Sequence, residues 1–151
     1  MSDNIKTDVS IVGGSLTGLT AAIGLAELGL QVTVIDIIPI KDQVEPSFDG
    51  RSSAIAFASC EMLKALGIWK FLDNQTQPIL DIRVSDGPSL MHLHFDHEDL
   101  GEGPLGNMVE NRHMRIALSK RVDELNNINI LAPEYVENID HAKASTTLTL
   151  K

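Results

Sequence analysis

Glycines near the N-terminus have the spacing of a phosphate-binding turn. Gly13 and Gly18 occupy the first and third positions of a G-x-G-x-x-G pattern, and Ser15 stands at the second. In such a pattern the first glycine permits a tight turn, the second lets the backbone approach a pyrophosphate, and the third allows close packing of a helix. Free N–H groups at the start of that helix would attract phosphate oxygens. The residues predicted to bind a dinucleotide here are Gly13, Gly14, Ser15, Leu16, Thr17 and Gly18.

Ser15 is the one departure from this pattern. Its Cβ is expected to face the path of the phosphates, where a glycine has none. Serine is small, so we expect weakened rather than abolished binding, and replacement of Ser15 by glycine should then tighten it.

Asp36 lies 23 residues beyond Gly13, at the end of an apolar segment. A carboxylate at this distance can accept hydrogen bonds from a ribose. It would also repel a 2′-phosphate, so FAD or NAD fits this site better than NADP.

The periodicity of apolar residues predicts the elements that position these side chains. Residues 9–12 and 32–35 are expected to form parallel strands of a buried sheet. Between them, residues with spacings of three and four predict one buried helix face, and Gly29 is a natural stop for that helix. The residues of this face are Leu19, Ala22, Ile23 and Ala26. The alternative interpretation is a glycine-rich turn in some other α/β protein.

The rest of the chain continues as alternating helices and strands. We expect a loop over 38–50 that contains Pro39, Pro46 and Gly50, and a helix over 52–69 with Gly67 as its stop. A further turn is expected over 68–72, a glycine-rich loop over 101–106, and a helix through 114–125 that ends at 126–127. Strands are predicted over 79–86 and 90–95 around the turn 86–88, over 128–131 parallel to the first two, and over 134–140 and 145–150.

Composition bounds the class of protein. The chain has 151 residues, of which 43% are hydrophobic and 22% charged, which is ordinary for one globular domain. Its net charge of −9 argues against a nucleic-acid partner. No segment has the length of a membrane span, and no secretion signal is recognised. The single cysteine, Cys60, excludes an internal disulfide, fits a reducing cytoplasm and is expected in the core.

Two groups of charged residues could be functional or could simply be solvated. His92, His94 and His97 stand beside acidic residues at 96, 98 and 99, which invites a metal site, but a solvated acidic loop is favoured and we predict no metal. His113 and Arg115 are expected on a solvated helix face. The last strand runs to Lys151 without a closing turn, which fits either a terminal edge strand or the front portion of a larger protein.

Three segments together carry a resemblance. The first is IVGGSLTGLTAA with Asp36. The second runs from Asp49-Gly50-Arg51 to Leu66-Gly67-Ile68-Trp69, and the third is Gly106-Asn107-Met108-Val109-Glu110-Asn111 with Leu118. In this order they resemble the FAD-dependent aromatic hydroxylases, specifically the ubiquinone-biosynthesis branch (2-octaprenyl-6-methoxyphenol hydroxylase-like).

The resemblance implies an α/β, Rossmann-like FAD/NAD(P)-binding fold of the GR2 type, with a parallel central sheet plus a β segment. It implies a monooxygenase with FAD as cofactor, NAD(P)H as electron donor and a polyprenyl phenol as substrate. The expected location is cytoplasmic, with a peripheral position at the inner membrane as an option. Partners would include other ubiquinone-pathway proteins or a separate C-terminal half.

The resemblance also implies site residues and a domain boundary. Arg51 would lie near the FAD phosphates, and Asn111 would lie near the flavin; the alternatives are a surface arginine that starts a helix and a helix N-cap. The family's later aspartate-glycine and glycine-aspartate signatures are missing, so residues 1–151 would be an incomplete N-terminal FAD-binding domain, and no catalytic residue is assigned. The alternative function is a stand-alone or remnant dinucleotide-binding module without catalysis.

Overall fold

Three strands form a parallel sheet. The computed structural model describes residues 4–45, 49–72, 74–87, 91–99, 101 and 103–151. Strands β1 (Val9–Val12), β2 (Val32–Ile35) and β8 (Ile128–Leu131) pair in the order β1-β2-β8, all parallel. All three strands match the predicted ones. Val12, Ile35 and Leu131 are aligned in register, so the segments that follow the strands leave from one edge of the sheet.

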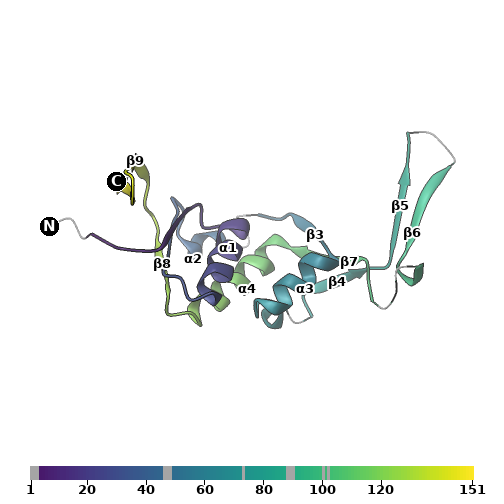
Figure 1. Cartoon of the computed structure of the whole chain (residues 1–151). Helices are drawn as coiled ribbons and strands as arrows, with labels where there is room; N and C mark the ends of the chain where they lie inside the picture. Colours follow the sequence, from purple (N-terminus) through teal and green to yellow (C-terminus); the bar gives the residue numbers. More distant parts are fainter. Residues whose placement is uncertain (1–3, 46–48, 73, 88–90, 100, 102) are drawn as a thin grey trace.

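Two helices pack against each other beside this sheet. Helix α1 (Leu16–Glu27) contacts helix α4 (Asn111–Asp123), which lies far from it in the sequence (Figure 1). The predicted apolar face of α1 is confirmed, because all four of its residues are buried. Helix α4 begins before the predicted segment 114–125 and ends at Asp123.

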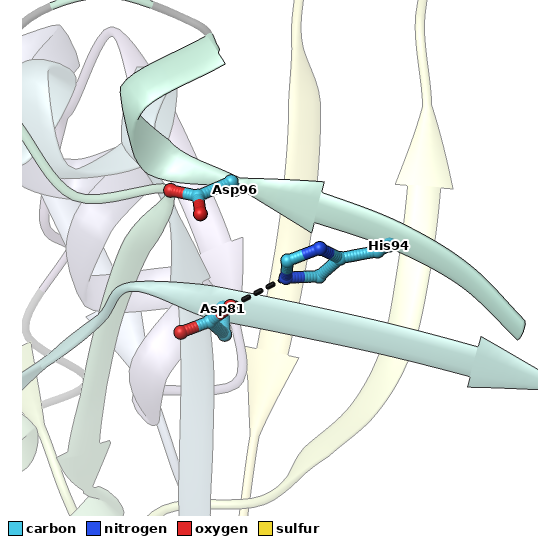
Figure 2. A group of neighbouring side chains, drawn as sticks. All are labelled: Asp81, His94 and Asp96. Atoms are coloured by element: carbon cyan, nitrogen blue, oxygen red, sulfur yellow. Dashed lines mark hydrogen bonds and ion pairs between the residues drawn. The ribbon is translucent and has the colours of Figure 1, made fainter.

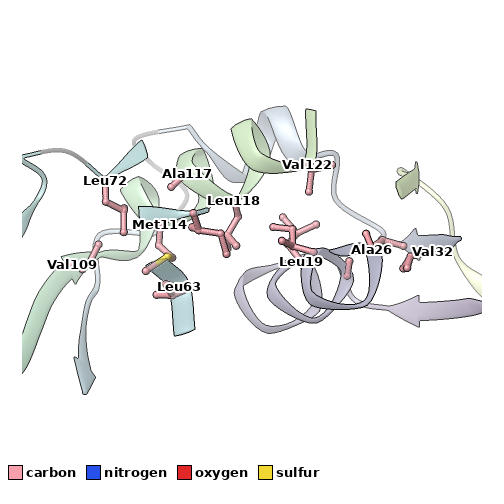
Figure 3. Close-up of a cluster of buried hydrophobic side chains, with 14 residues drawn as sticks. Leu19, Ala26, Val32, Leu63, Leu72, Val109, Met114, Ala117, Leu118 and Val122 are labelled. Atoms are coloured by element: carbon pink, nitrogen blue, oxygen red, sulfur yellow. The ribbon is translucent and has the colours of Figure 1, made fainter. Parts of the chain in front are cut away.

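A second, antiparallel sheet lies at the other end of α4. It has the order β3-β7-β4, formed by β3 (Ser52–Ala56), β7 (Gly106–Glu110) and β4 (Thr76–Ile79). Helix α3 (Phe57–Ala65) and the 3-10 helix η1 (Trp69–Phe71) pack beside it. The hydrophobic core is continuous between the two sheets and runs from Val32 past Leu19 and Leu118 to Val109 (Figure 3).

The predicted helix over 52–69 is therefore wrong at its start. Residues 52–56 form β3, and the helix begins only at Phe57. The strand forms because β7 pairs with it from a distant part of the chain, and Gly106 permits the close approach: a Cβ there would lie 2.3 Å from the Ile55 carbonyl oxygen. Strands β4 and β7 were not predicted. The predicted turn after the helix is confirmed as η1, and Gly67 has a positive φ of 70°.

The remaining elements lie at the periphery. The predicted loop over 38–50 contains a short helix, α2 (Ile40–Gln43), and Pro46 lies outside the described residues. Strands β5 (Asp81–Ser85) and β6 (His92–Asp96) form the predicted hairpin, followed by η2 (His97–Asp99), and Pro88 of its turn also lies outside the described residues. This hairpin extends away from the rest of the chain (Figure 1). The two predicted strands of the tail are confirmed as β9 (Val136–His141) and β10 (Thr146–Leu150), and the structure shows that they pair with each other in antiparallel fashion. None of the described helices has the length and apolar character needed to cross a membrane.

Candidate dinucleotide-binding site

Gly13 forms the turn between β1 and α1. Its φ is +107°, a conformation that favours glycine, and its N–H donates a hydrogen bond to the Ile35 carbonyl oxygen. An added Cβ would have no atom within 4 Å, so the space beside Gly13 is open. The turn therefore leaves room on its outer side for a ligand to approach the backbone.

Gly14 is held against Asp36, the residue that follows β2. The Gly14 N–H donates to Asp36 Oδ2 at 2.5 Å, and the Ile38 N–H donates to Asp36 Oδ1 at 2.7 Å. A Cβ on Gly14 would lie 3.2 Å from both Asp36 Cβ and Val34 Cγ1. The pattern in the sequence leaves this position free, but the structure favours glycine there. The carboxylate retains acceptor capacity for another donor, because its two oxygens offer about four lone-pair sites.

Gly18 lies in the first turns of α1, directly against the glycine turn. A Cβ at this position would lie 1.7 Å from the Gly13 carbonyl oxygen. Close packing at the third glycine was predicted, and the structure shows that the group it packs against is the turn itself.

Ser15 is the N-cap residue of α1, and Leu16 and Thr17 are the first helical residues. Its side chain makes no capping hydrogen bond to the helix, and the first turn holds no acidic side chain. The Ser15 hydroxyl instead accepts a hydrogen bond from Arg115 Nε of α4, at 3.4 Å. The start of α1 thus presents N–H groups that no side-chain cap occupies, next to a buried cation.

Asp49 connects this turn with α4 and with the segment that leads into β3. Arg51 donates to both Asp49 oxygens from Nε at 2.8 Å and Nη2 at 3.0 Å. Arg115 Nη2 donates to Asp49 Oδ2 at 2.9 Å, and Asn111 Nδ2 donates to the same oxygen at 3.1 Å. These hydrogen bonds hold the pKa of the Asp49 carboxyl well below its ordinary value. The bond from Arg51 has the largest effect, followed by the bond from Asn111. Asp49 is therefore a carboxylate in the folded chain.

One expectation from the sequence and parts of two alternatives are corrected here. Arg115 is not on a solvated face, because it is 5% exposed and forms an ion pair with Asp49. Asn111 is not the N-cap of α4, because Glu110 holds that position. The amide oxygen of Asn111 instead accepts a hydrogen bond from Ser53 Oγ at 2.6 Å. Arg51 does not start a helix but precedes β3, with a side chain that is 80% exposed.

Arg115 was missed although the sequence carries a signal for it. Its spacing from Leu118 and Val122 is three and seven, and both of these residues were predicted on the apolar face of the helix. A charged residue at such a position is buried only with a partner. Asp49, the partner, lies 66 residues earlier in the chain.

The acidic and histidine residues of the β5–β6 hairpin are far from this site. His94 Nε2 and Asp81 Oδ1 are 2.5 Å apart across the two strands, and Asp96 lies beside them (Figure 2). His94 was singled out from the sequence, whereas Asp81 was missed because it belongs to the other strand. The contact with His94 lowers the pKa of the Asp81 carboxyl. An exposed hydrogen bond accounts for His94 and Asp81, and we assign no metal to this group. Cys60 is buried, as predicted.

Comparison with known proteins identifies similar chains. The model of the family described as "FAD binding domain" matches residues 6–147. The ubiquinone hydroxylase UbiL of Rhodospirillum rubrum is 46% identical over 126 residues, which cover 83% of this chain and 29% of that protein. The 3-demethoxyubiquinol 3-hydroxylase of Escherichia coli is 33% identical, with 86% of this chain and 34% of that protein covered. This chain thus spans about a third of the length of the curated relatives it matches.

Solved structures share the fold at low sequence identity. The anhydrotetracycline hydroxylase OxyS of Streptomyces rimosus superposes with a TM-score of 0.77 at 16% identity, over 97% of this chain and 28% of that one. The flavin-dependent monooxygenase PieE, solved with FAD and substrate, gives a TM-score of 0.76 at 16% identity, over 99% of this chain and 27% of that one. These likenesses establish a mixed α/β fold of the kind found in flavin-dependent monooxygenases.

Proposed function

This chain belongs to the FAD-binding domain family, and from that premise we propose that it is the N-terminal, FAD-binding part of a monooxygenase. The whole enzyme would hydroxylate a polyprenylated phenol in ubiquinone biosynthesis. The observation that carries the proposal is the 46% identity to a ubiquinone hydroxylase over 83% of this chain. The family match over residues 6–147 contains both the glycine turn and the Asp49 network.

The proposed FAD site uses the residues at the carboxyl edge of the parallel sheet. Gly13, Gly14, Ser15, Leu16, Thr17 and Gly18 would hold the pyrophosphate, and Asp36 would accept hydrogen bonds from the adenosine ribose. Arg51 would reach the phosphates, since its guanidinium is exposed and its planar donors suit phosphate oxygens. Asn111 would lie near the flavin, with its side chain held by the hydrogen bond to Asp49.

The described residues fit a dinucleotide. Close contacts at Gly14 and Gly18 exclude side chains, whereas the space beside Gly13 is open. The first turn of α1 carries no acidic residue that would repel a phosphate. Bound FAD supplies redox chemistry that amino acids lack; the residues of this chain bind it and fix its orientation.

We further propose the GR2 version of the Rossmann-like fold, NAD(P)H as electron donor, and a single domain over residues 1–151 that is completed by a C-terminal part. Other ubiquinone-pathway proteins are proposed partners at a peripheral position on the inner membrane. The second candidate function is a dinucleotide-binding module without catalysis. It needs only the glycine turn and Asp36, whose close contacts with each other the structure shows.

Titration of the purified chain with FAD, followed by quenching of flavin fluorescence, tests the cofactor. We expect saturable binding that ADP displaces; failure of both ligands to bind would overturn the proposal. Hydroxylation is tested on the longest natural product of the gene, with NAD(P)H, O₂ and a polyprenyl phenol. FAD binding without any hydroxylated product would support the module instead.

A further inference from the structure

The hydroxyl of Ser15 has an unusual partner for an N-cap serine. Such a side chain normally accepts a hydrogen bond from an N–H in the first turn of its helix. Here that bond is missing within the described part of the chain, and the hydroxyl lies 3.4 Å from Arg115 Nε. The N–H groups in the first turn of α1 therefore have no side-chain cap, and the Ser15 hydroxyl is oriented by Arg115 of helix α4.

The chemistry of this pair fixes the direction of the hydrogen bond. A guanidinium has only donors, so Ser15 Oγ must be the acceptor. The hydroxyl then keeps its own proton for a second partner, and the described residues supply no acceptor for it. A phosphate oxygen at the start of α1 is an acceptor of the required kind.

Arg115 is itself held in place. Its side chain is 6% exposed and its Nη2 donates to Asp49 Oδ2 at 2.9 Å. Asp49 is 5% exposed and is fixed in turn by Arg51 and Asn111. A guanidinium anchored at one end in this way loses little further freedom when its Nε orients the serine.

We propose that Arg115, anchored by Asp49, is a positioning residue that orients the Ser15 hydroxyl to donate a hydrogen bond to the pyrophosphate of FAD. This inference rests on the proposed function. It reverses the sign expected for Ser15 from the sequence alone: the serine strengthens phosphate binding instead of weakening it.

The test measures dissociation constants of FAD, ADP and adenosine for the full chain. Ser15→Ala and Ser15→Gly should each raise the constants for FAD and ADP by about threefold to tenfold, the effect of one lost hydrogen bond. Adenosine, which has no phosphate, should bind as before. Ser15→Thr retains a hydroxyl and should restore most of the affinity. Ser119→Ala, which removes a hydroxyl from α4 one turn away from Arg115, is the matched control.

A double-mutant cycle isolates the role of Arg115. In an Arg115→Lys background, Ser15→Ala should cost less than in the wild-type chain, because lysine lacks the Nε donor that directs the hydroxyl. Thermal unfolding of each variant checks the fold.

The outcomes separate this inference from the function on which it rests. Equal or tighter FAD binding by Ser15→Gly and Ser15→Ala, or strictly additive effects in the cycle, would overturn the inference alone. Failure of the wild-type chain to bind FAD and ADP would overturn the proposed function and the inference with it.

Discussion

Arg115 and Asp49 form an ion pair that is buried on both sides. Arg115 Nη2 lies 2.9 Å from Asp49 Oδ2, and the two side chains are 6% and 5% exposed. The pair joins α4 to the segment before β3, which are 66 residues apart in the sequence. Because Arg115 also reaches Ser15, one carboxylate holds three separate parts of the chain around the glycine turn.

Acid should weaken the fold through Asp49. Its pKa is lowered from an ordinary value of 3.8, chiefly by the hydrogen bond from Arg51. A carboxyl whose folded pKa is lowered stabilises the fold above the unfolded value, and this contribution is lost as the pH falls through the folded value. Asp49→Asn should therefore reduce the free energy of unfolding at neutral pH, and its difference from the wild type should shrink below about pH 4.

Urea unfolding at neutral pH and at pH 3 measures that difference. Asp123→Asn is the control, since Asp123 is exposed at the end of α4. A difference that stays constant over this range would contradict the assignment.

Gly18 and Gly24 lie on the same helix and should respond in opposite ways to alanine. A Cβ on Gly18 would lie 1.7 Å from the Gly13 carbonyl oxygen, whereas one on Gly24 would meet only Leu66 Cδ2 at 3.9 Å. We expect Gly18→Ala to lose about 3 kcal/mol or more of stability through overpacking. Gly24→Ala should gain about 0.5–1 kcal/mol from helix propensity. Thermal and urea unfolding of the two variants compare them directly, and equal stabilities would refute the close contact.

Asp36 should control both affinity and the choice of nucleotide. Hydrogen bonds to a charged group contribute about 1.5–3 kcal/mol, so Asp36→Ala should weaken FAD binding by about tenfold to a hundredfold. The same variant should narrow the preference for ADP over 2′,5′-ADP, since the charge that repels a 2′-phosphate is gone. Calorimetric titration with both nucleotides provides the comparison. Asp42→Ala, an exposed acid in α2, should behave as the wild type.

Arg51 should affect binding more than folding. Its side chain is 80% exposed, so water screens its charge. When Arg51 is replaced, Arg115 and Asn111 still donate hydrogen bonds to the Asp49 carboxylate. Arg51→Gln should therefore shift the unfolding temperature little but weaken FAD binding by about tenfold. The loss should be smaller at high salt, which screens the attraction between guanidinium and phosphate. Arg83→Gln, on the distant hairpin, is the matched charge deletion; if it weakens binding as much, the effect comes from net charge and not from the site.

The elements predicted well are those whose signal is local. The β1-α1-β2 unit, α4 and β8 each carry a complete apolar pattern within a few residues, and Gly29 marks the end of α1 with a positive φ of 86°. Strand β3 was predicted as helix because its serine, alanine and isoleucine residues fit either element. The strand is determined by its pairing with β7, in which Ser53 lies opposite Val109, 56 residues later in the chain. The glycine turn and Asp36 were predicted for the same local reason. The Asp49–Arg115 ion pair could not be predicted from the sequence, because neither residue alone indicates which residue is its partner.

The β5–β6 hairpin has a consequence for how the chain can be engineered. Its strands pair with each other in a separate sheet, and the His97 N–H donates to the Leu80 carbonyl oxygen at 3.0 Å, which brings the two ends together. One face is apolar and exposed, with Val84 at 54% and Leu93 at 60%. Residues 81–96 can therefore be exchanged for a short glycine-rich linker without separating β4 from β7. The shortened chain would lose this exposed apolar face and keep every residue of the nucleotide site, which favours its use for crystallisation with FAD.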